Sequence, residues 1–412
     1  MSGTSTQSTQ RGRTETEFAR PGRPAISGPE GILYDFNYGC RVQVPVDGWL
    51  VRMTDLDTLN VLLNETVEAN AVITSMRKYF VRFLLEVFDG KRLVFSHAFN
   101  AANKKIAIRM TSPALGDSLA WIPVIDKFRE QHRCEIHLPM AEHLLPLYRE
   151  GYPLLQFATH AELDTRTDEF YATYYIGLLK PFSERDHQPT DPRVSNMQDA
   201  IAYLLGVPCE ERRPNVVIAD KTRMIPERYV CIATQATTQC KYWNNPRGWS
   251  TLIDYLKSLG YRVLCIDRDK QYGNEKHMNT MPEGAEDFTG NRPLQERASL
   301  LLHADFFVGL GSGLSWLAWA VGVPVIMISG FSHPSMEFKT PYRVINFHGC
   351  NSCFNDTTTE FNGEDFGWCP RRFNKPQPFQ CTAVITPEFV MRIADNLMRD
   401  HALGLKHLGQ AV

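Results

Sequence analysis

The stretch DFFVGLGSGLSWLAWAVGVPVIMIS, residues 305–329, contains the pattern that decides the fold. The apolar run DFFVGL predicts a buried strand, GSG a loop, LSWLAWAVG a helix and VPVIMIS a second strand. Short apolar runs bounded by glycine or proline are typical of parallel strands covered on both faces. The order strand, helix, strand therefore predicts a parallel βαβ unit.

The same alternation continues upstream. YVCIAT (229–234), WSTLIDYLKSLG (249–260), YRVLCID (261–267) and LQERASLLLHA (294–304) predict strand, helix, strand and helix. A second unit is predicted where KKIAIRM (104–110) is followed by a helix and by CEIHL (134–138). We therefore predict two Rossmann-like lobes that face each other across a cleft, with ligands beyond the carboxyl ends of the strands.

The two ends of the chain have different patterns. Residues 1–28 are polar and predict a flexible arm. From about residue 31 to 102 the chain is rich in β-favouring residues, and Asp89-Gly90 joins two such runs as a hairpin. This region predicts an antiparallel sheet or small barrel. Near the C-terminus, Thr386 caps a predicted helix with Pro387 in its first turn.

Composition excludes several classes of protein. The 412 residues are 43% hydrophobic and 22% charged, which is typical of a folded globular protein, and the net charge of -2 argues against nucleic-acid binding. No apolar run is long enough to span a membrane, and the N-terminus lacks a secretory signal pattern. Six cysteines are scattered singly, which favours a reducing cytoplasm.

The glycine loop is the first candidate site. Gly311, Ser312, Gly313 and Leu314 follow a predicted strand and open a helix, so free backbone N–H groups and the helix dipole would attract a diphosphate. The spacing is not GxGxxG, so NAD is not favoured. The alternative is a tight turn that merely needs glycine.

Charged residues on neighbouring loops supply the other candidates. Lys241 follows the first strand of the same lobe and suits a phosphate, although an exposed lysine is the simpler alternative. Arg297 is a weaker candidate for that pocket, the alternative being an exposed helical arginine. Asp117 opens the first helix of the opposite lobe, where a carboxylate can accept a hydroxyl proton or simply cap the helix.

Four cysteines form the last pattern. Cys350, Cys353, Cys369 and Cys381 have the spacing C-x2-C-x15-C-x11-C in a segment rich in glycine and proline. Four sulfur ligands select zinc or iron in a closed structural site, and from the ligands alone zinc is the first expectation. Four unrelated core thiols are the alternative.

Together the glycine loop, the Asp117 and Lys241 loops and the four-cysteine pattern resemble the bacterial autotransporter heptosyltransferases. The resemblance implies an α/β fold of the GT-B type, with an N-terminal β-rich, barrel-like domain and an inserted metal finger. The expected divisions are the arm (1–28), the β-rich domain (29–102), the acceptor-side lobe (103–225), the nucleotide-sugar-binding lobe (226–345), the finger (346–384) and a C-terminal helix (385–412).

The resemblance also implies a function. The family transfers heptose from ADP-glycero-manno-heptose to serine hydroxyls of autotransporter adhesins in the cytoplasm. Asp117 would be the base and Lys241 would neutralise the donor diphosphate, with Arg297 and the glycine loop lining the ADP site. The four cysteines would hold one structural ferric iron, instead of zinc, and support a homododecamer. The alternatives are a lipopolysaccharide-core heptosyltransferase or other GT-B glycosyltransferase, and a non-enzymatic, metal-stabilised scaffold.

Overall fold

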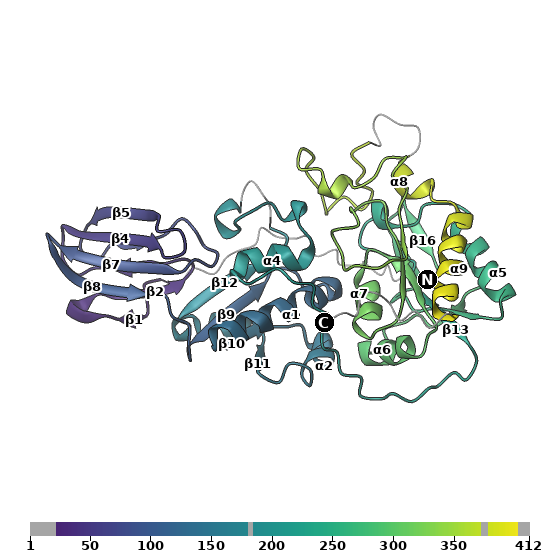
Figure 1. The fold of residues 1–412 in the computed structure, drawn as a ribbon, viewed down its shortest axis with the longest axis horizontal. Coiled ribbons are helices and arrows are strands. Elements are labelled where there is room, and N and C mark those ends of the chain that lie inside the picture. Colours follow the sequence, from purple (N-terminus) through teal and green to yellow (C-terminus); the bar gives the residue numbers. More distant parts are fainter. Residues whose placement is uncertain (1–21, 180–183, 372–377, 403–412) are drawn as a thin grey trace, which may run out of the picture.

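The protein is described by a computed structural model that covers residues 22–179, 184–371 and 378–402. Three regions follow one another along the long axis (Figure 1). They are an N-terminal β-rich region, the lobe expected at residues 103–225, which keeps the name acceptor-side lobe, and the lobe expected from residue 226 onward, which is called the donor-side lobe. Residues 1–21 of the predicted arm and 403–412 of the predicted C-terminal segment lie outside the described residues.

The N-terminal region contains a four-stranded antiparallel sheet with the order β5-β4-β7-β8. The hairpin predicted at Asp89-Gly90 is confirmed, since Asp89 pairs with Arg92 across the turn and Gly90 has a φ of 59°. Buried and half-buried side chains alternate along two central strands because one face of the sheet lies on the core. The strands are β4 (Trp49–Asp55), β5 (Val61–Val67), β7 (Phe83–Asp89) and β8 (Arg92–Ala98).

The remaining strands of this region extend the acceptor-side sheet. β2 (Leu33–Asn37) pairs in parallel with β12 (Ala172–Ile176), and the sheet runs β11-β10-β9-β12-β2-β3-β6, with β1 on β2. The described strands thus form open sheets and not a closed barrel, which corrects the barrel-like expectation. Residues 26–27, expected in the arm, form a strand. The additional strands are β1 (Ile26–Ser27), β3 (Arg41–Gln43) and β6 (Val72–Thr74).

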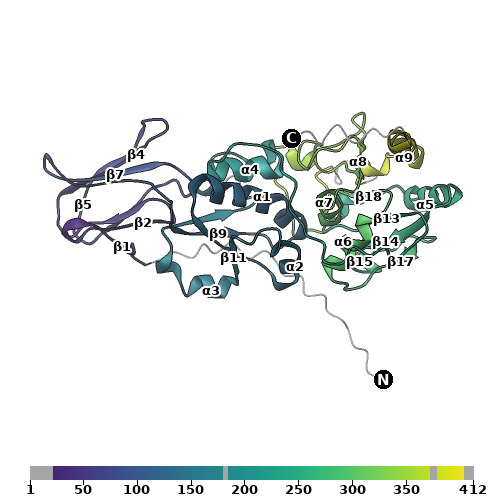
Figure 2. The same ribbon diagram turned by 60° about the horizontal axis from the view of Figure 1, so that its bottom comes forward.

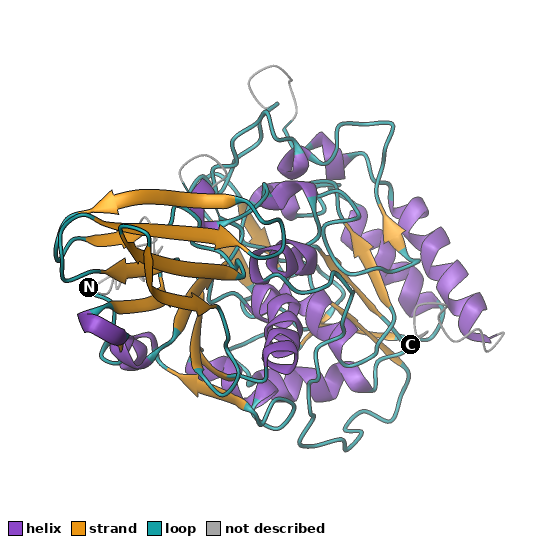
Figure 3. Cartoon of the chain, turned by 60° about the vertical axis from the view of Figure 1, so that its left-hand side comes forward, coloured by secondary structure: helices purple, strands orange, loops and turns teal. Residues whose placement is uncertain are grey.

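The acceptor-side lobe contains the βαβ unit expected after residue 103. β9 (Lys105–Met110), α1 (Leu115–His132) and β10 (Glu135–Pro139) follow in order, and β9 and β10 are parallel. Trp121 and Phe128 of α1 are fully buried. Figure 3 shows the strands of the N-terminal region gathered on one side of the helices. The other elements are β11 (Leu155–Ala158), α2 (Leu145–Tyr148), α3 (His160–Asp164) and α4 (Met197–Leu205).

The donor-side lobe is a six-stranded parallel sheet with the order β17-β14-β13-β18-β19-β20. The stretch at 305–329 forms strand, helix and strand as expected. Thr386 accepts a hydrogen bond from Phe389 N at 3.3 Å, so the predicted cap is confirmed. The elements are β13 (Tyr229–Ile232), α5 (Gly248–Ser258), β14 (Arg262–Cys265), β17 (Glu286–Asp287), α6 (Leu294–Leu302), β18 (Phe307–Leu310), α7 (Gly313–Ala320), β19 (Val325–Ile328), β20 (Arg343–Val344), α8 (Gln380–Ala383) and α9 (Pro387–Ala402).

Short elements complete the chain. A two-stranded hairpin, β15 (Gln271–Gly273) with β16 (Met278–Thr280), lies in the donor-side lobe. The 3₁₀ turns are η1 (Pro29–Gly31), η2 (Glu142–Leu144), η3 (Thr167–Glu169), η4 (Arg185–His187), η5 (Pro192–Val194), η6 (Gln239–Lys241) and η7 (Cys353–Asn355). Within the described ranges, no helix has both the length and the apolar character needed to cross a bilayer.

One apolar core links the regions. The largest cluster of buried side chains includes residues of the N-terminal sheet, such as Phe36, of α1 and of the donor-side helix α7. Phe36 lies within ring-contact distance of Phe83, Phe99 and Tyr171, which come from both sides of the boundary expected at residue 102. The β-rich region and the acceptor-side lobe therefore share side-chain packing as well as backbone hydrogen bonds.

Phe36→Ala should lower the free energy of unfolding by about 3–5 kcal/mol, because a fully packed ring is removed from the shared core. Urea unfolding followed by fluorescence measures this change. Val61→Ala, at a side chain that is 55% exposed on the edge strand β5, is the control and should change the free energy by less than about 0.5 kcal/mol. Equal effects of the two substitutions would contradict the shared core.

Candidate functional site

Two helix starts, one from each lobe, meet at the centre of the candidate site. α1 of the acceptor-side lobe packs along α7 of the donor-side lobe, and the two lie side by side in Figure 2. A Cβ atom placed on Gly313 would lie 3.0 Å from Gly116 N, and one placed on Gly116 would lie 3.3 Å from Gly313 Cα. The backbones therefore touch where the helices begin.

This contact explains the glycines of the loop. Gly311 and Gly313 are absent from the residues with positive φ, so neither is needed for a left-handed turn. Gly313 is needed for the approach to Gly116, and a Cβ on Gly311 would lie 2.6 Å from Glu337 Oε1. The two glycines are therefore explained by close packing against Gly116 and Glu337, and the alternative of a tight turn that needs glycine is not required. The loop still presents the first N–H groups of α7, which no side chain caps.

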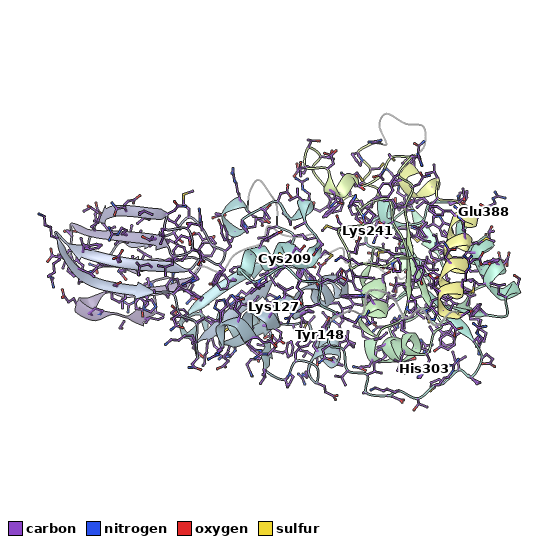
Figure 4. The ribbon with its side chains drawn as sticks, viewed as in Figure 1. Lys127, Tyr148, Cys209, Lys241, His303 and Glu388 are labelled. Atoms are coloured by element: carbon purple, nitrogen blue, oxygen red, sulfur yellow. The ribbon has the colours of Figure 1, made fainter. Side chains whose placement is uncertain are left out.

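Asp117 is the third residue of α1, and the N-cap is Ala114. The aspartate is half-buried and is next in sequence to the glycine that touches the donor-side loop. Ser118, the following residue, is held by a 2.8 Å hydrogen bond to the hydroxyl of Tyr148, which is labelled in Figure 4. The first turn of α1 is thereby fixed, and Asp117 lies at the junction of the lobes and not at the N-cap position.

Lys241 ends the 3₁₀ turn η6 on the loop after β13 and is half-buried. Its ammonium nitrogen lies 5.6 Å from the centre of the Phe331 ring, a cation–π distance. None of the ion pairs in the described ranges includes this lysine. In Figure 4 it lies on the side of the donor-side lobe that faces the acceptor-side lobe. Its positive charge is thus available to an anion.

Arg297 has a different environment from the one expected. Its side chain is buried, and its Nη2 donates to the carbonyl oxygens of Asp267 at 2.8 Å and Gly290 at 2.7 Å. Burial lowers the pKa of the guanidinium. The guanidinium donates to backbone carbonyls, so the structure gives it the role of fastening two loops. Because the side chain is buried, the alternative of an exposed helical arginine is wrong. Its hydrogen bonds to backbone carbonyls favour a supporting role over direct contact with a ligand.

The four cysteines form two pairs, and Cys381 of the first pair lies in α8, which is labelled in the upper part of Figure 1. Cys350 and Cys381 share a hydrogen bond, which lowers the pKa of Cys350, while Cys353 and Cys369 pack against a small cluster of Cys240, Phe331, Trp368 and Phe379. In the parts of the chain that the structure describes, no three His, Cys, Asp or Glu side chains are placed to hold one metal ion. The predicted metal finger is therefore not shown.

The donor set nevertheless suits a thiophilic metal. All four cysteines are free thiols, and two of them line one cavity of about 300 Å³ together with Arg371. The hydrogen bond with Cys381 and the nearby Arg371 lower the pKa of Cys350 and favour its thiolate, the form that binds metal, whereas burial raises the pKa of Cys353 and the shared hydrogen bond raises that of Cys381. The local segment has only a small apolar cluster of its own, in which Trp368 and Phe379 are buried and Phe354 and Phe361 pack against it.

Two residues that the sequence reasoning missed shape the site. Asp267 is buried and accepts hydrogen bonds from Thr234 N, Thr234 Oγ1 and Gln235 N at 2.8, 2.8 and 3.3 Å. It therefore fixes the start of the loop that leads to Lys241. Its position directly after a buried strand was the available signal. Cys240 joins the cysteine cluster, and no spacing pattern distinguishes it from the other single cysteines.

Two family models match separate parts of the chain. The family described as "Glycosyltransferase TibC, N-terminal domain" matches residues 28–91, and "Glycosyltransferase family 9 (heptosyltransferase)" matches residues 174–358. The autotransporter heptosyltransferase BAHTCr of Citrobacter rodentium is 46% identical over 89% of this chain and 89% of that protein. The autotransporter heptosyltransferase TibC of Escherichia coli is 45% identical over 92% of this chain and 93% of its own.

A crystal structure of TibC has the same fold. It is described as a dodecameric, iron-containing heptosyltransferase in complex with ADP-D-β-D-heptose, and it matches with a TM-score of 0.88 and 44% identity over 92% of this chain and 99% of that one. A further relative, BimC of Burkholderia thailandensis, is 40% identical over 90% of this chain and 86% of that protein and is described as an inactive autotransporter heptosyltransferase. Membership of this group and activity are thus separate questions.

Gly313→Ala should destabilise the protein by about 1–3 kcal/mol, because the added methyl group would push the start of α7 away from Gly116. Thermal or urea unfolding measures the loss. Gly22→Ala is the matched control, since a Cβ there meets nothing within 4 Å. If both variants were as stable as the unsubstituted chain, this result would contradict a tight backbone contact between Gly116 and Gly313.

Proposed function

The chain belongs to the autotransporter heptosyltransferase family, and on this basis we propose that it transfers a heptosyl group from ADP-heptose to serine hydroxyls of an autotransporter adhesin. Family membership rests on identity above 40% over most of the chain. The glycosyltransferase class follows from it. The donor is proposed from the crystal structure of TibC, which contains ADP-heptose. The acceptor is proposed from the autotransporter heptosyltransferase relatives and from the family resemblance of the sequence.

The observation that carries the proposal is the meeting of Gly116 and Gly313. Because Asp117 directly follows Gly116, this contact supports a site in which a carboxylate of one lobe acts near the uncapped start of α7 in the other. A glycosyl transfer needs a proton acceptor on the acceptor side and positive charge on the donor side, and these groups supply both. Lys241, half-buried and facing the same junction, adds the cationic side chain.

The proposed reaction is a displacement at the anomeric carbon. The serine oxygen forms a bond to that carbon, the bond between the carbon and the diphosphate oxygen breaks, and the electron pair leaves with ADP. Asp117 accepts the hydroxyl proton as general base. Lys241 and the N–H groups at the start of α7 stabilise the negative charge that develops on the departing diphosphate.

Gly311, Ser312, Gly313 and Leu314 would lie against the diphosphate of ADP in this proposal. The support is the uncapped helix start and the dipole that it presents. Arg297 would act indirectly, because its hydrogen bonds to the carbonyls of Asp267 and Gly290 order loops of the donor-side lobe. It is therefore proposed as a residue that supports the ADP site without touching the nucleotide.

We extend the proposal to the cysteine segment and to assembly. Cys350, Cys353, Cys369 and Cys381 would hold one structural iron ion, with zinc as the alternative. The support is their spacing, their proximity in the fold and the iron-containing description of TibC. Bound metal would add stability to a segment whose own apolar core is one small aromatic cluster. A homododecamer is proposed from the same relative.

Lys241→Ala and Asp117→Asn should each lower kcat/KM by about 10²-fold or more, because each removes charge stabilisation or proton acceptance in the transition state. The measurement is the mass added to a purified adhesin passenger fragment in the presence of ADP-heptose, together with ADP release. Lys257→Ala is the matched control: this exposed lysine of α5 donates to Gly284 O at 3.3 Å, and its loss should leave the rate unchanged.

The same assay separates the alternatives. Transfer to a lipopolysaccharide-core acceptor and not to the passenger would favour the lipopolysaccharide enzyme. ADP binding without transfer to either acceptor would favour a non-enzymatic scaffold. One relative, BimC, is described as an inactive heptosyltransferase. Normal turnover of Lys241→Ala would show that this lysine does not bind the diphosphate.

Metal analysis tests the cysteine segment. The purified protein should contain about one iron per chain and show a ferric–thiolate absorption band, and Cys353→Ser should lose both the metal and the band. Cys265→Ser, at a buried cysteine of β14 outside the segment, is the control and should keep them. A colourless protein with stoichiometric zinc would replace iron by zinc, and a metal-free protein would remove the site.

A further inference from the structure

Arg193 is a buried cation that binds its neighbour Asp191 and also backbone carbonyls far away in the sequence. It is the middle residue of η5 in the acceptor-side lobe and is 6% exposed. Asp191 pairs with it, at 3.0 Å from Nε and 2.7 Å from Nη2. Burial of such a pair costs desolvation energy, so the remaining N–H groups need partners, and these come from the cysteine segment.

Three backbone carbonyls between Cys353 and Cys369 accept from the guanidinium. Arg193 Nη1 donates to Thr359 O at 2.7 Å and to Asp356 O at 3.2 Å, and Nη2 donates to Thr357 O at 3.2 Å. The turn that presents these carbonyls is held by the Asp356 carboxylate, which accepts from Thr358 N and from the hydroxyl groups of Thr358 and Thr359. The arginine thus binds a preformed loop.

Asn355 adds a second connection. Its side-chain amide donates to Arg193 O at 2.7 Å, and its Oδ1 accepts from His333 N at 2.8 Å. His333 lies on the donor-side loop after β19, two residues beyond Phe331. One side chain therefore bridges the acceptor-side lobe and the loop that carries the ring beneath Lys241.

From this loop, ring contacts lead to Lys241. Phe331 lies 5.2 Å from both Phe354 and Phe361, measured between ring centres, and Phe331 O accepts from Phe354 N at 3.1 Å. The Phe331 ring lies below the Lys241 ammonium group. The backbone of η6, the 3₁₀ turn that contains Lys241, is also bonded to the cysteine segment, since Gln239 N donates to Phe366 O at 2.8 Å.

We infer that Arg193 is a positioning residue that sets the place of Lys241 by anchoring the cysteine segment to the acceptor-side lobe. Its guanidinium holds the 356–359 loop, the loop orders Phe354 and Phe361 against Phe331, and Phe331 supports the lysine. This inference rests on the proposed function in that Lys241 is taken to meet the diphosphate. Its consequence is that a residue of the acceptor-side lobe affects binding of the donor nucleotide.

A double-mutant cycle on ADP affinity tests this inference without using turnover. ADP binding is measured by titration calorimetry for the full-length chain, Arg193→Ala, Lys241→Ala and the double variant. Arg193→Ala should weaken ADP binding about three- to tenfold in the unsubstituted background and should have no further effect once Lys241 is alanine. Arg212→Ala is the matched control: this arginine of the same lobe pairs with Glu210 at 3.3 Å and should leave ADP affinity unchanged.

Three outcomes would overturn the inference: unchanged ADP affinity in a folded Arg193→Ala protein, an equal loss in both backgrounds, or an equal loss in the Arg212→Ala control. If Arg193→Ala does not fold, Asn355→Ala enters the same cycle with the same expectations, since it removes the bond to Arg193 O. If the unsubstituted chain does not bind ADP, the proposed function fails first. If Lys241→Ala loses ADP affinity and Arg193→Ala does not, the proposed function is retained and only the role of Arg193 is contradicted.

Discussion

Backbone contact between Gly116 and Gly313 is the constraint on which the site depends. Two helices from different lobes begin at the same place because neither glycine carries a side chain, and a methyl group on either would fall at or inside van der Waals distance of the other backbone. The contact sets the spacing between the lobes at one point. It also directs two uncapped helix starts, which attract negative charge, toward the same region.

Two charged side chains, Asp117 and Lys241, have complementary roles in the proposed reaction. Asp117 lies in the first turn of α1, and Lys241 lies on the donor-side loop, with its ammonium group over the aromatic ring of Phe331. A lysine paired with a carboxylate would have little charge to offer an anion, whereas a ring restricts its position and leaves most of its charge available. Asp267 holds the beginning of the same loop by three hydrogen bonds. Rigid support of this kind lowers the cost of ordering a site when its ligand binds.

The cysteine segment forms a second connection between the lobes. Arg193 and Asn355 attach it to the acceptor-side lobe, and Phe331 and Gln239 attach it to the donor-side lobe. The segment has a small aromatic cluster of its own, and these bonds and the proposed metal would add to its order. A structural metal site placed there would therefore influence the nucleotide site without contacting substrate, which gives a reason for a sulfur-rich insert in an enzyme of this fold.

The sequence alone determined the local elements. The strands and helices of both lobes, the hairpin at Gly90 and the cap at Thr386 follow from apolar runs and turn residues that are close together in the chain. The loop positions of Asp117 and Lys241 and the spacing of the four cysteines made these residues candidates, and the resemblance to the family supplied the roles expected of them. Only the tertiary structure decided the pairing of β2 with β12, the reason for Gly313, the carbonyl partners of Arg297 and the link from Arg193 to residues 356–359. These contacts join residues far apart in sequence, and local periodicity carries no information about which distant surfaces will meet.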